Sequence, residues 1–335
     1  MRVIFFGTGA IGGTAGAWVA AKHAETVLVA RGNTYRAIRE NGLTLYREGG
    51  PRERVRVNVV ECLEDAPDAD VVVIAVKNFN LEQVCPAIRD RFGIKPVIVG
   101  LQNGVRNQRI LPRYFPRVLY GIVGYNAWID TPGVIGFQKK GPILLGTPDN
   151  GLRAEARAVA GIFQRGVPAP VIDRLQDAAH CKLVLNLSNS VTTLVGHGYG
   201  PVEPLPLFQR ILSNVLLEGI QIVRAAGHRE FRISGMPNWA LIKASAKLPQ
   251  FATLPLFRRN LRKMVRSSMS QDVIQCGRHE SELEDINGYL IGLADSHGIP
   301  APYNRAVYRL CQEHFSRPAF APVPVRDVWN RIAST

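Results

Sequence analysis

Long runs of apolar residues, separated by glycine-rich or polar turns, characterise the first half of the chain. The runs at 2–6, 26–30, 71–76 and 96–101 are continuous rather than alternating in polarity. Continuous apolar strands that alternate with helical stretches are typical of a parallel sheet covered on both faces. From about residue 118 to 147, short apolar segments and Gly/Pro turns replace the helices, which predicts an antiparallel extension of the same sheet.

A helical pattern begins after residue 170 and continues almost to the end of the chain. Apolar residues recur there at the three- and four-residue spacing of helices. The predicted helices are Ala178–Val195, Leu205–Ala226, Pro237–Ala246, Arg258–Cys276, Ser281–His297 and Asn304–His314. Because 335 residues exceed one ordinary domain, we expect two: an α/β domain with a doubly wound sheet over 1–175, and an all-helical domain over 176–335.

The composition is that of a globular protein and gives little support to a polyanionic partner. Hydrophobic residues make up 46% and charged residues 20% of the chain, and no apolar run approaches the length of a membrane span. The net charge of +14 is divided between the two predicted domains, +8 and +6, without a basic tail. We therefore expect neither nucleic acid nor membrane as a partner, and leave a homodimer open.

The densest group of positive charges, here called the basic cluster, consists of Arg258, Arg259, Arg262, Lys263 and Arg266. Its spacing predicts one face of a helix, and we interpret that face as solvated. A patch for RNA or for an acidic partner is the alternative, and steep salt dependence of binding would support it.

Cysteine and histidine show no pattern that suggests a disulfide framework or a metal site. The five cysteines are scattered, and the seven histidines form no paired motif. We therefore expect no disulfide, no protein-bound metal and a reducing, cytoplasmic location. Glycines between residues 7 and 16 would interrupt the apolar segment of a signal peptide, so we expect the first residues to belong to the fold.

A glycine-rich turn follows the first predicted strand and opens a predicted helix, the context in which G-x-G-x-x-G binds a dinucleotide in a Rossmann-type fold. Gly7 permits the tight turn, Gly9 lets the backbone approach a pyrophosphate, and Gly12 allows close packing of helix on strand. The helix N-terminus offers free N–H groups to phosphates. The predicted cofactor contacts of this turn are Gly7, Thr8, Gly9, Ala10, Ile11 and Gly12. A glycine-rich turn without a ligand is the alternative.

The residue after the second predicted strand indicates which dinucleotide is bound. An acidic side chain there would bind the ribose hydroxyls of NAD, but this chain has Arg31. A guanidinium can hold a 2′-phosphate through charge-assisted hydrogen bonds. The sequence therefore favours NADP, although Arg31 could also merely begin a surface loop.

Two further polar residues, Lys77 and Asn103, follow predicted strands of the sheet. Ligands of doubly wound sheets bind beyond the carboxyl ends of the strands, so both are candidate site residues. The asparagine of the Gln102–Gly104 turn could equally serve the turn itself.

One face of the predicted helix 178–195 carries polar residues, although the helix is otherwise apolar. Residues at helical spacing along this polar stripe are Lys182, Asn186, Asn189, Ser190 and Thr193. A solvated helix face usually carries more charges than the one found here, so we interpret the stripe as the lining of a cleft. For Glu282, further along the chain, an exposed acid in the first turn of a helix capped by Ser281 is the simplest interpretation.

In combination these segments resemble the ketopantoate reductase (2-dehydropantoate 2-reductase) family over nearly the whole chain. The resemblance rests on Gly7–Gly12, Val76-Lys77, Gln102–Gly104, Lys182–Asn186, Ser267–Asp272, Glu282–Gly288 and His297–Pro302. It implies an enzyme that uses NADPH to reduce a 2-oxo acid to a 2-hydroxy acid, ketopantoate first among them, in pantothenate and coenzyme A biosynthesis.

The resemblance also implies roles for individual residues. Lys182 corresponds to the general acid of the family, and Glu282 to a glutamate that hydrogen-bonds the substrate's hydroxyl groups. The positions that correspond to substrate contacts are Asn186, Ser190 and Ser268, and those at the nicotinamide and active site are Lys77 and Asn103. An ammonium can stabilise the oxygen that becomes negative when a ketone accepts hydride and can then protonate it.

The chain departs from the family pattern in its second half. Ser190 stands where the family commonly has asparagine, and residues 229–266 look expanded. The spacing after Ser268 is about two residues longer than usual, so Glu280 competes with Glu282 for the family glutamate. Two alternatives therefore stay open: a relative that reduces a different 2-oxo acid, and a non-catalytic NADP(H)-binding regulator.

Overall fold

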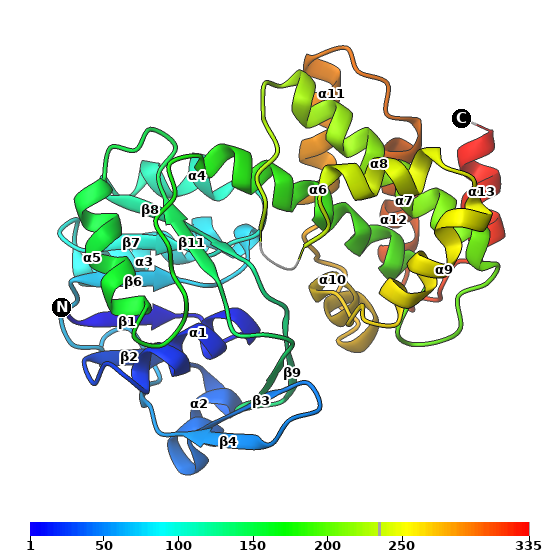
Figure 1. Cartoon of the computed structure of the whole chain (residues 1–335). Coiled ribbons are helices and arrows are strands. Elements are labelled where there is room, and N and C mark those ends of the chain that lie inside the picture. Colours follow the sequence, from blue (N-terminus) through cyan, green and yellow to red (C-terminus); the bar gives the residue numbers. More distant parts are fainter. Residues whose placement is uncertain (234–235, 335) are drawn as a thin grey trace. The chain divides into compact units, whose positions relative to one another are not determined.

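A computed structural model describes residues 1–233 and 236–334 of the chain. The chain divides into two compact units, Met1–Gln176 and Asp177–Thr335 (Figure 1). The division falls in the first turn of helix α6 (Leu175–Leu194). The sequence had suggested a boundary between residues 175 and 176.

Seven strands form the main sheet of the first unit, in the order β11-β8-β7-β6-β1-β2-β5. Their bounds are β1 (Val3–Phe6), β2 (Thr26–Val29), β5 (Asn58–Val60), β6 (Val71–Ile74), β7 (Val97–Gly100), β8 (Val118–Val123) and β11 (Ile143–Gly146). All neighbours pair in parallel except β11, which runs antiparallel to β8. Strands β1, β2, β6 and β7 are fully buried, as their unbroken apolar sequences predict. The Rossmann-type sheet expected from the sequence is confirmed.

The segment 118–147 is only partly the antiparallel extension that we expected. Its first strand, β8, pairs in parallel with β7, and only β11 adds an antiparallel edge. Its two middle strands leave the main sheet altogether. They belong to a second sheet of order β4-β3-β10-β9, with bounds β3 (Leu43–Arg47), β4 (Arg52–Val55), β9 (Ala127–Thr131) and β10 (Val134–Phe137).

Helix α1 (Ala10–Ala20) packs against both sheets, which explains why it is buried nearly all round. Two glycines allow the helix to lie close to the two sheets. A Cβ on Gly16 would press on Phe5 and Leu28 of the main sheet, and one on Gly13 would collide with Ile135 of the second sheet. The helix that begins at the glycine-rich turn is thus fixed from two sides (Figure 1).

The remaining helices of the first unit are short and connect its strands. Their bounds are α2 (Gly32–Asn41), η1 (Asn78–Asn80), α3 (Leu81–Phe92), α4 (Asn107–Ile110), η2 (Leu111–Arg113) and α5 (Arg153–Phe163).

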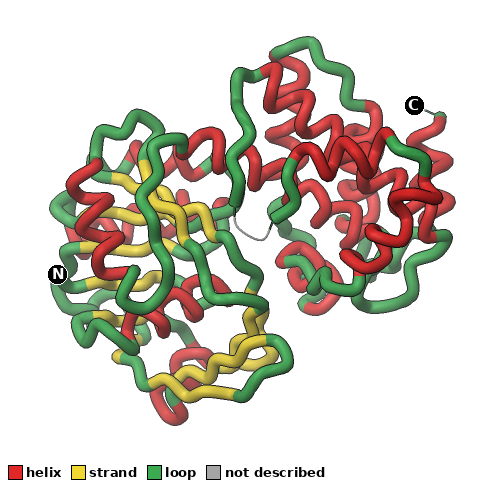
Figure 2. Tube along the Cα trace, viewed as in Figure 1, coloured by secondary structure: helices red, strands yellow, loops and turns green. Residues whose placement is uncertain are grey.

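The described part of the second unit contains helices and loops but no strand, so the all-helical expectation is confirmed (Figure 2). After α6 come α7 (Leu205–Ala225), α8 (Trp239–Lys247), α9 (Gln250–Leu261), α10 (Ser268–Ser270), η3 (Gln271–Gln275), η4 (Glu284–Gly288), α11 (Tyr289–Ser296), α12 (Pro302–Phe315) and α13 (Val325–Ala333). The elements η3 and η4 are π-helical turns.

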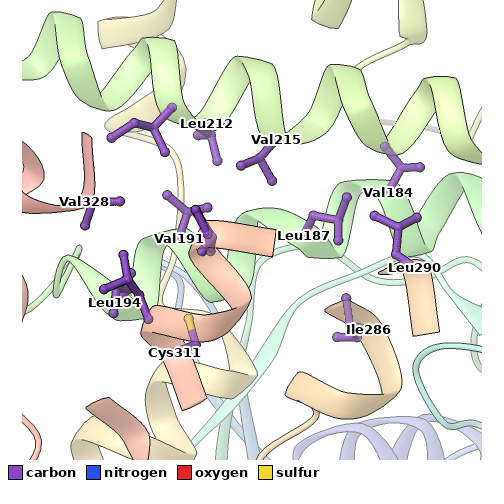
Figure 3. Close-up of a cluster of buried hydrophobic side chains, with 14 of the residues drawn as sticks. Val184, Leu187, Val191, Leu194, Leu212, Val215, Ile286, Leu290, Cys311 and Val328 are labelled. Atoms are coloured by element: carbon purple, nitrogen blue, oxygen red, sulfur yellow. The ribbon is translucent and has the colours of Figure 1, made fainter. Parts of the chain in front are cut away.

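The core of this unit forms on the face of α6 opposite its polar stripe. Apolar side chains at helical spacing on α6 pack against those of α7, η4, α11, α12 and α13 (Figure 3). The labelled members are Val184, Leu187, Val191, Leu194, Leu212, Val215, Ile286, Leu290, Cys311 and Val328. The amphipathic pattern of α6 therefore fixes which face of the helix remains for chemistry.

Two predicted helices of the second unit differ from those observed. The expected helix 258–276 is interrupted, because α9 ends at Leu261 and α10 begins only at Ser268. The basic cluster therefore does not lie on one face of a continuous helix. Ser281 is not the N-cap of η4, which is Leu283, but its hydroxyl accepts the backbone N–H of Leu283 at 3.3 Å, as a capping side chain at this turn would.

A buried carboxylate holds the start of α12. Glu218 of α7 is 7% exposed and accepts hydrogen bonds from the backbone N–H groups of Tyr303 and Asn304, at 3.0 and 2.9 Å, and from the Asn304 side chain at 2.8 Å. A negative charge at a helix N-terminus satisfies N–H groups that have no partner within the helix.

Replacing this carboxylate should destabilise the second unit. We expect Glu218→Leu to lower the free energy of unfolding by about 3 kcal/mol, because several buried donors lose their acceptor. Urea denaturation would measure the loss, and Glu218→Gln, which keeps one acceptor, should lose less. An unchanged midpoint for Glu218→Leu would contradict this role.

Candidate functional site

The glycine-rich turn has the geometry that a dinucleotide requires. Gly7 has φ +99°, a conformation that L side chains rarely adopt, and a Cβ on Gly12 would collide with the carbonyl oxygen of Gly7. A Cβ on Gly9 would meet nothing within 4 Å, so the space in front of this residue is open. Gly9 is the N-cap of α1, and no acidic residue lies in the first turn. The residues present therefore fit a bound pyrophosphate.

A cavity of about 440 Å³ adjoins this turn in the first unit. The side chain of Arg31, which is exposed, lies with its guanidinium 5.8 Å from the ring centroid of Phe6. The hydroxyl of Thr8 donates to the carbonyl of Val29 at 2.7 Å and joins the turn to β2. Residues that line the cavity are Phe6, Gly7, Thr8, Val29, Ala30, Arg31, Thr34, Val76, Asn80, Gln83 and Val84. The structure thus brings Gly7, Thr8 and Arg31 to one cavity.

An acidic residue also lies close to this region. The carboxylate of Glu61 accepts the backbone N–H of Gly32 at 3.2 Å, directly after Arg31. Its contact with the residue that follows Arg31 is relevant to the choice between NAD and NADP, because carboxylates bind ribose hydroxyls and cations bind a 2′-phosphate.

Lys77 and Asn103 lie on two neighbouring loops at the carboxyl ends of β6 and β7. Two buried amides that the sequence analysis did not assign to the site hold these loops. Asn78 donates to the carbonyl of Asn103 at 2.7 Å, and Gln102 donates to the carbonyls of Ile74 and Val76, at 2.7 and 3.0 Å. Asn78 and Gln102 show only a weak signal in the sequence, because each is simply a polar residue directly next to a candidate site residue.

In the second unit, Lys182 lies partly buried on the polar stripe of α6. Burial lowers the pKa of this lysine from its ordinary value to about 8, and the carboxylate of Glu282 opposes that shift. The ammonium is therefore a stronger acid than a solvent-exposed lysine and remains charged near neutral pH.

Glu282 is not the exposed first-turn acid of the simplest interpretation. It is 2% exposed, and its carboxylate accepts a hydrogen bond from the Ser268 hydroxyl at 3.0 Å. Glu280, the competing glutamate, is exposed. The structure therefore brings together Lys182 of α6, Ser268 of α10 and Glu282 of the turn before η4.

Asn186, one turn after Lys182, carries a buried amide nitrogen that has no hydrogen-bond partner among the described residues. Because buried donors are almost always satisfied, this unsatisfied donor one helical turn from Lys182 makes Asn186 a candidate to bind a ligand oxygen.

Ser190 lies deeper than a substrate contact would. It is fully buried, and its hydroxyl donates to the carbonyl of Leu187 at 2.9 Å and accepts from the Asn287 amide at 3.1 Å. Asn287, which the sequence analysis did not assign, thus connects α6 to η4, the turn that follows Glu282.

A second cavity, of about 320 Å³, lies beside α6. Cys181 and Leu185 contribute to it from the helix, and most of its other lining side chains are apolar. These come from the region that looked expanded in the sequence, of which residues 234–235 lie outside the described part. Lining residues are Cys181, Leu185, Glu230, Phe231, Arg232, Ile233, Met236, Pro237, Asn238 and Trp239.

Other types of site are not found in the described residues. No group of three or more His, Cys, Asp or Glu side chains there could hold a metal ion, and no described helix is long and apolar enough to cross a membrane. All five cysteines are free thiols.

A Rossmann-type unit with an open glycine turn and a helical unit that holds a partly buried lysine and a glutamate are features that fit an NAD(P)H-dependent oxidoreductase. Residues 3–150 match the family model described as ketopantoate reductase PanE/ApbA, and residues 166–314 match the one described as ketopantoate reductase PanE/ApbA C terminal. The chain belongs to the ketopantoate reductase family, as its motifs suggested.

Individual relatives agree with this assignment. The chain is 27% identical over 311 residues to the 2-dehydropantoate 2-reductase of Archaeoglobus fulgidus, covering 92% of this chain and 96% of that protein. It is 25% identical to the crystal structure of a PanE/ApbA family ketopantoate reductase from Ralstonia eutropha JMP134, with a TM-score of 0.75 and coverage of 95% and 100%. A ternary structure of D-mandelate dehydrogenase with NADH and anilino(oxo)acetate shares the fold, with a TM-score of 0.75 at 19% identity and coverage of 93% and 98%.

Proposed function

We propose that the protein reduces a 2-oxo acid to the 2-hydroxy acid with NADPH, and that ketopantoate is the substrate. The observation that carries the proposal is the group around Lys182. A lysine with a pKa of about 8, a buried glutamate and an unsatisfied asparagine amide suit a small oxygen-rich substrate. The product would be pantoate, a precursor of pantothenate and coenzyme A, formed in the cytoplasm.

Each residue of this group has a role in the proposed reaction. A dinucleotide bound at the glycine turn would supply the hydride that adds to the carbonyl carbon, while the electrons of the C=O bond move to its oxygen. Lys182 hydrogen-bonds that oxygen, stabilises the developing charge and transfers a proton from Nζ to it. The neutral amine then regains a proton from solvent.

The neighbours of Lys182 orient the substrate. Asn186 donates its free N–H group to a substrate oxygen, and Glu282 accepts hydrogen bonds from substrate hydroxyl groups, as in the family resemblance. Ser268, which donates to Glu282 at 3.0 Å, holds that carboxylate in place and is itself a substrate contact. Ser190 acts through Asn287, because its own hydroxyl is fully buried.

For the cofactor, we propose that Gly7–Gly12 binds the pyrophosphate and Arg31 binds the 2′-phosphate of NADP. Lys77 and Asn103 contact the nicotinamide end and the active site. Asn78 and Gln102, which are hydrogen-bonded to the two loops, position them.

Arg31→Ala should weaken NADPH binding by about tenfold to 100-fold and leave NADH binding nearly unchanged, because only NADPH carries the 2′-phosphate. Fluorescence titration with both dinucleotides measures this difference. Arg36→Ala, an exposed arginine on the following helix, is the matched control. Equal losses of affinity for the two cofactors would overturn the assignment. If the native protein binds NADH tightly and Glu61→Gln loses that binding, the site is one for NAD.

The proposed activity is tested by following the absorbance of NADPH with a panel of 2-oxo acids, and by repeating the panel with NADH. Rapid turnover of ketopantoate supports the proposal. Tight NADPH binding without turnover of any 2-oxo acid would instead favour the non-catalytic regulator.

The cavity beside α6 supports a second candidate, a reductase for a bulkier 2-oxo acid. Leu185 lies three residues after Lys182, so the two side chains are neighbours on the helix surface. An apolar substituent could occupy the cavity formed with Phe231 and Trp239. Higher kcat/KM for phenylglyoxylate or 4-methyl-2-oxopentanoate than for ketopantoate would select this candidate, and the reverse order would exclude it.

A further inference from the structure

The proposed function leaves unused an exposed apolar surface on the second unit. Helix α9 has no fully buried residue, and Phe251 near its start is 83% exposed. Leu248, just before the helix, and Leu256, within it, are 53% and 45% exposed. Large apolar side chains this exposed, and this close together, usually mark a surface that is covered by something else.

The charge of this region is entirely positive. Between Glu230 and Asp272 the sequence contains eight lysines and arginines and no aspartate or glutamate. Arg258, Arg259 and Arg262 are exposed, and none of the three forms an ion pair or a side-chain hydrogen bond within residues 1–233 and 236–334. Their charges are therefore available to a partner.

The apolar and basic residues share the outward side of α9. Leu254, Phe257 and Leu261 are partly buried against the helical core. Residues three and four positions apart lie along one helix face, which places Phe251, Pro255, Arg259 and Arg262 in a row on the other side. Arg258 lies on the same side as Phe251, whereas Leu256 is exposed on a different side of the helix. We call Leu248, Phe251, Arg258, Arg259 and Arg262 the α9 face (α9 is labelled in Figure 1).

We propose that the α9 face binds the surface of a membrane that contains anionic phospholipid. Exposed Phe and Leu side chains enter the boundary between headgroups and acyl chains, while arginines contact the phosphates and anionic headgroups. Binding to a membrane through this surface would require no membrane-spanning helix. It revises the expectation of no membrane partner, which was based on the lack of an apolar run long enough to span.

Two other occupants fit the α9 face less well. A second copy of the chain, packed by the same face, would bring three exposed arginines against three, with no carboxylate from residues 231–271 to pair with them. Like charges opposed in this way disfavour association. A nucleic acid would use the arginines but not Leu248, because bases stack on aromatic rings and not on aliphatic side chains.

Co-sedimentation of the full-length protein with vesicles tests the proposal. We expect binding to phosphatidylcholine vesicles that contain phosphatidylserine, little binding to phosphatidylcholine alone, and weaker binding as salt increases. Absence of binding to the anionic vesicles at low salt would overturn the proposal.

Paired variants locate the surface. Phe251→Ser should weaken vesicle binding by about tenfold, and Arg258→Gln/Arg259→Gln by about 30-fold. The matched controls lie on the first unit: Ile94→Ser, another exposed apolar residue, and Arg89→Gln/Arg157→Gln, which removes the same charge. Because all these positions are exposed, 2-oxo acid reduction in solution should be unchanged. Equal losses in target and control variants would contradict the proposal.

The alternative occupants give different results with the same variants. A dimer in sedimentation velocity that Phe251→Ser dissociates would show that a second copy covers the face. Binding of a labelled RNA oligonucleotide that depends on Arg258 and Arg259 but not on Phe251 or Leu248, without vesicle binding, would show a nucleic-acid surface. Either result would replace the membrane proposal.

Discussion

Lys182→Ala should lower kcat for 2-oxo acid reduction by about 10²- to 10⁴-fold, the usual contribution of a positioned proton donor. NADPH binding, measured by fluorescence, should be unchanged because the glycine turn lies in the other unit. Lys247→Ala, which removes an exposed lysine of the same unit, is the matched control. A variant that loses only substrate affinity, with kcat retained, would make Lys182 a binding residue and not the acid.

The pH dependence of the unmodified enzyme provides a second test of this role. The pKa of Lys182 is lowered to about 8, and the reduction requires its protonated form. We therefore expect kcat/KM to fall about tenfold per pH unit above pH 8, and the falling limb to be absent from the residual activity of Lys182→Ala. A profile that is flat to pH 10 would contradict the assignment.

The same pKa determines how the stability of the fold should respond to pH. Burial lowers the pKa of Lys182 to about 8, from an ordinary value of 10.5, so between these values the unfolded chain binds more protons than the folded chain. The contribution of Lys182 to stability must then rise as the pH is raised from 8 to 10.5. Comparison of urea midpoints for the native chain and Lys182→Met over this range measures the difference.

Glu282→Gln should lower kcat/KM by between about tenfold and 150-fold, the range for a lost hydrogen bond to a charged group. It should also move the falling limb of the pH profile to lower pH. The carboxylate of Glu282 favours the charged form of Lys182, so its removal makes the ammonium more acidic.

Glu280→Gln is the control for this prediction, because Glu280 is exposed and two residues away. It should behave as the native enzyme in both rate and pH profile. The opposite pattern, with a large loss for Glu280→Gln and none for Glu282→Gln, would mean that the side chains rearrange when substrate binds.

The features that could be predicted from the sequence are those that local spacing determines. The positions of Gly7 and Gly12 follow from a strand, a turn and a helix that are adjacent in the chain, and the structure has the expected turn. The polar stripe of α6 was likewise visible, because helical periodicity alone separates Lys182 and Asn186 from Val184 and Leu187.

The features that could not be predicted depend on residues far apart in the chain. The pairing of β10 with β3 joins residues about ninety positions apart, so the second sheet left no local signal. Ser190 is buried where its hydroxyl accepts a hydrogen bond from Asn287, and Glu282 is buried where its carboxylate accepts one from Ser268. From spacing alone we expected Glu282 to be exposed and Ser190 to line a cleft. Spacing also could not decide whether Glu280 or Glu282 corresponds to the family glutamate.

The most direct test of the proposed reaction is the transfer of deuterium from the cofactor to the substrate carbon. The enzyme would be incubated with ketopantoate and NADPH deuterated at C4 of the nicotinamide on one face or the other, and the product analysed by mass spectrometry. We expect pantoate that carries one deuterium at C2 with only one of the two cofactor preparations. Product without deuterium from either, or no pantoate while NADPH binds tightly, would contradict the assignment of this chain as a ketopantoate-reducing enzyme.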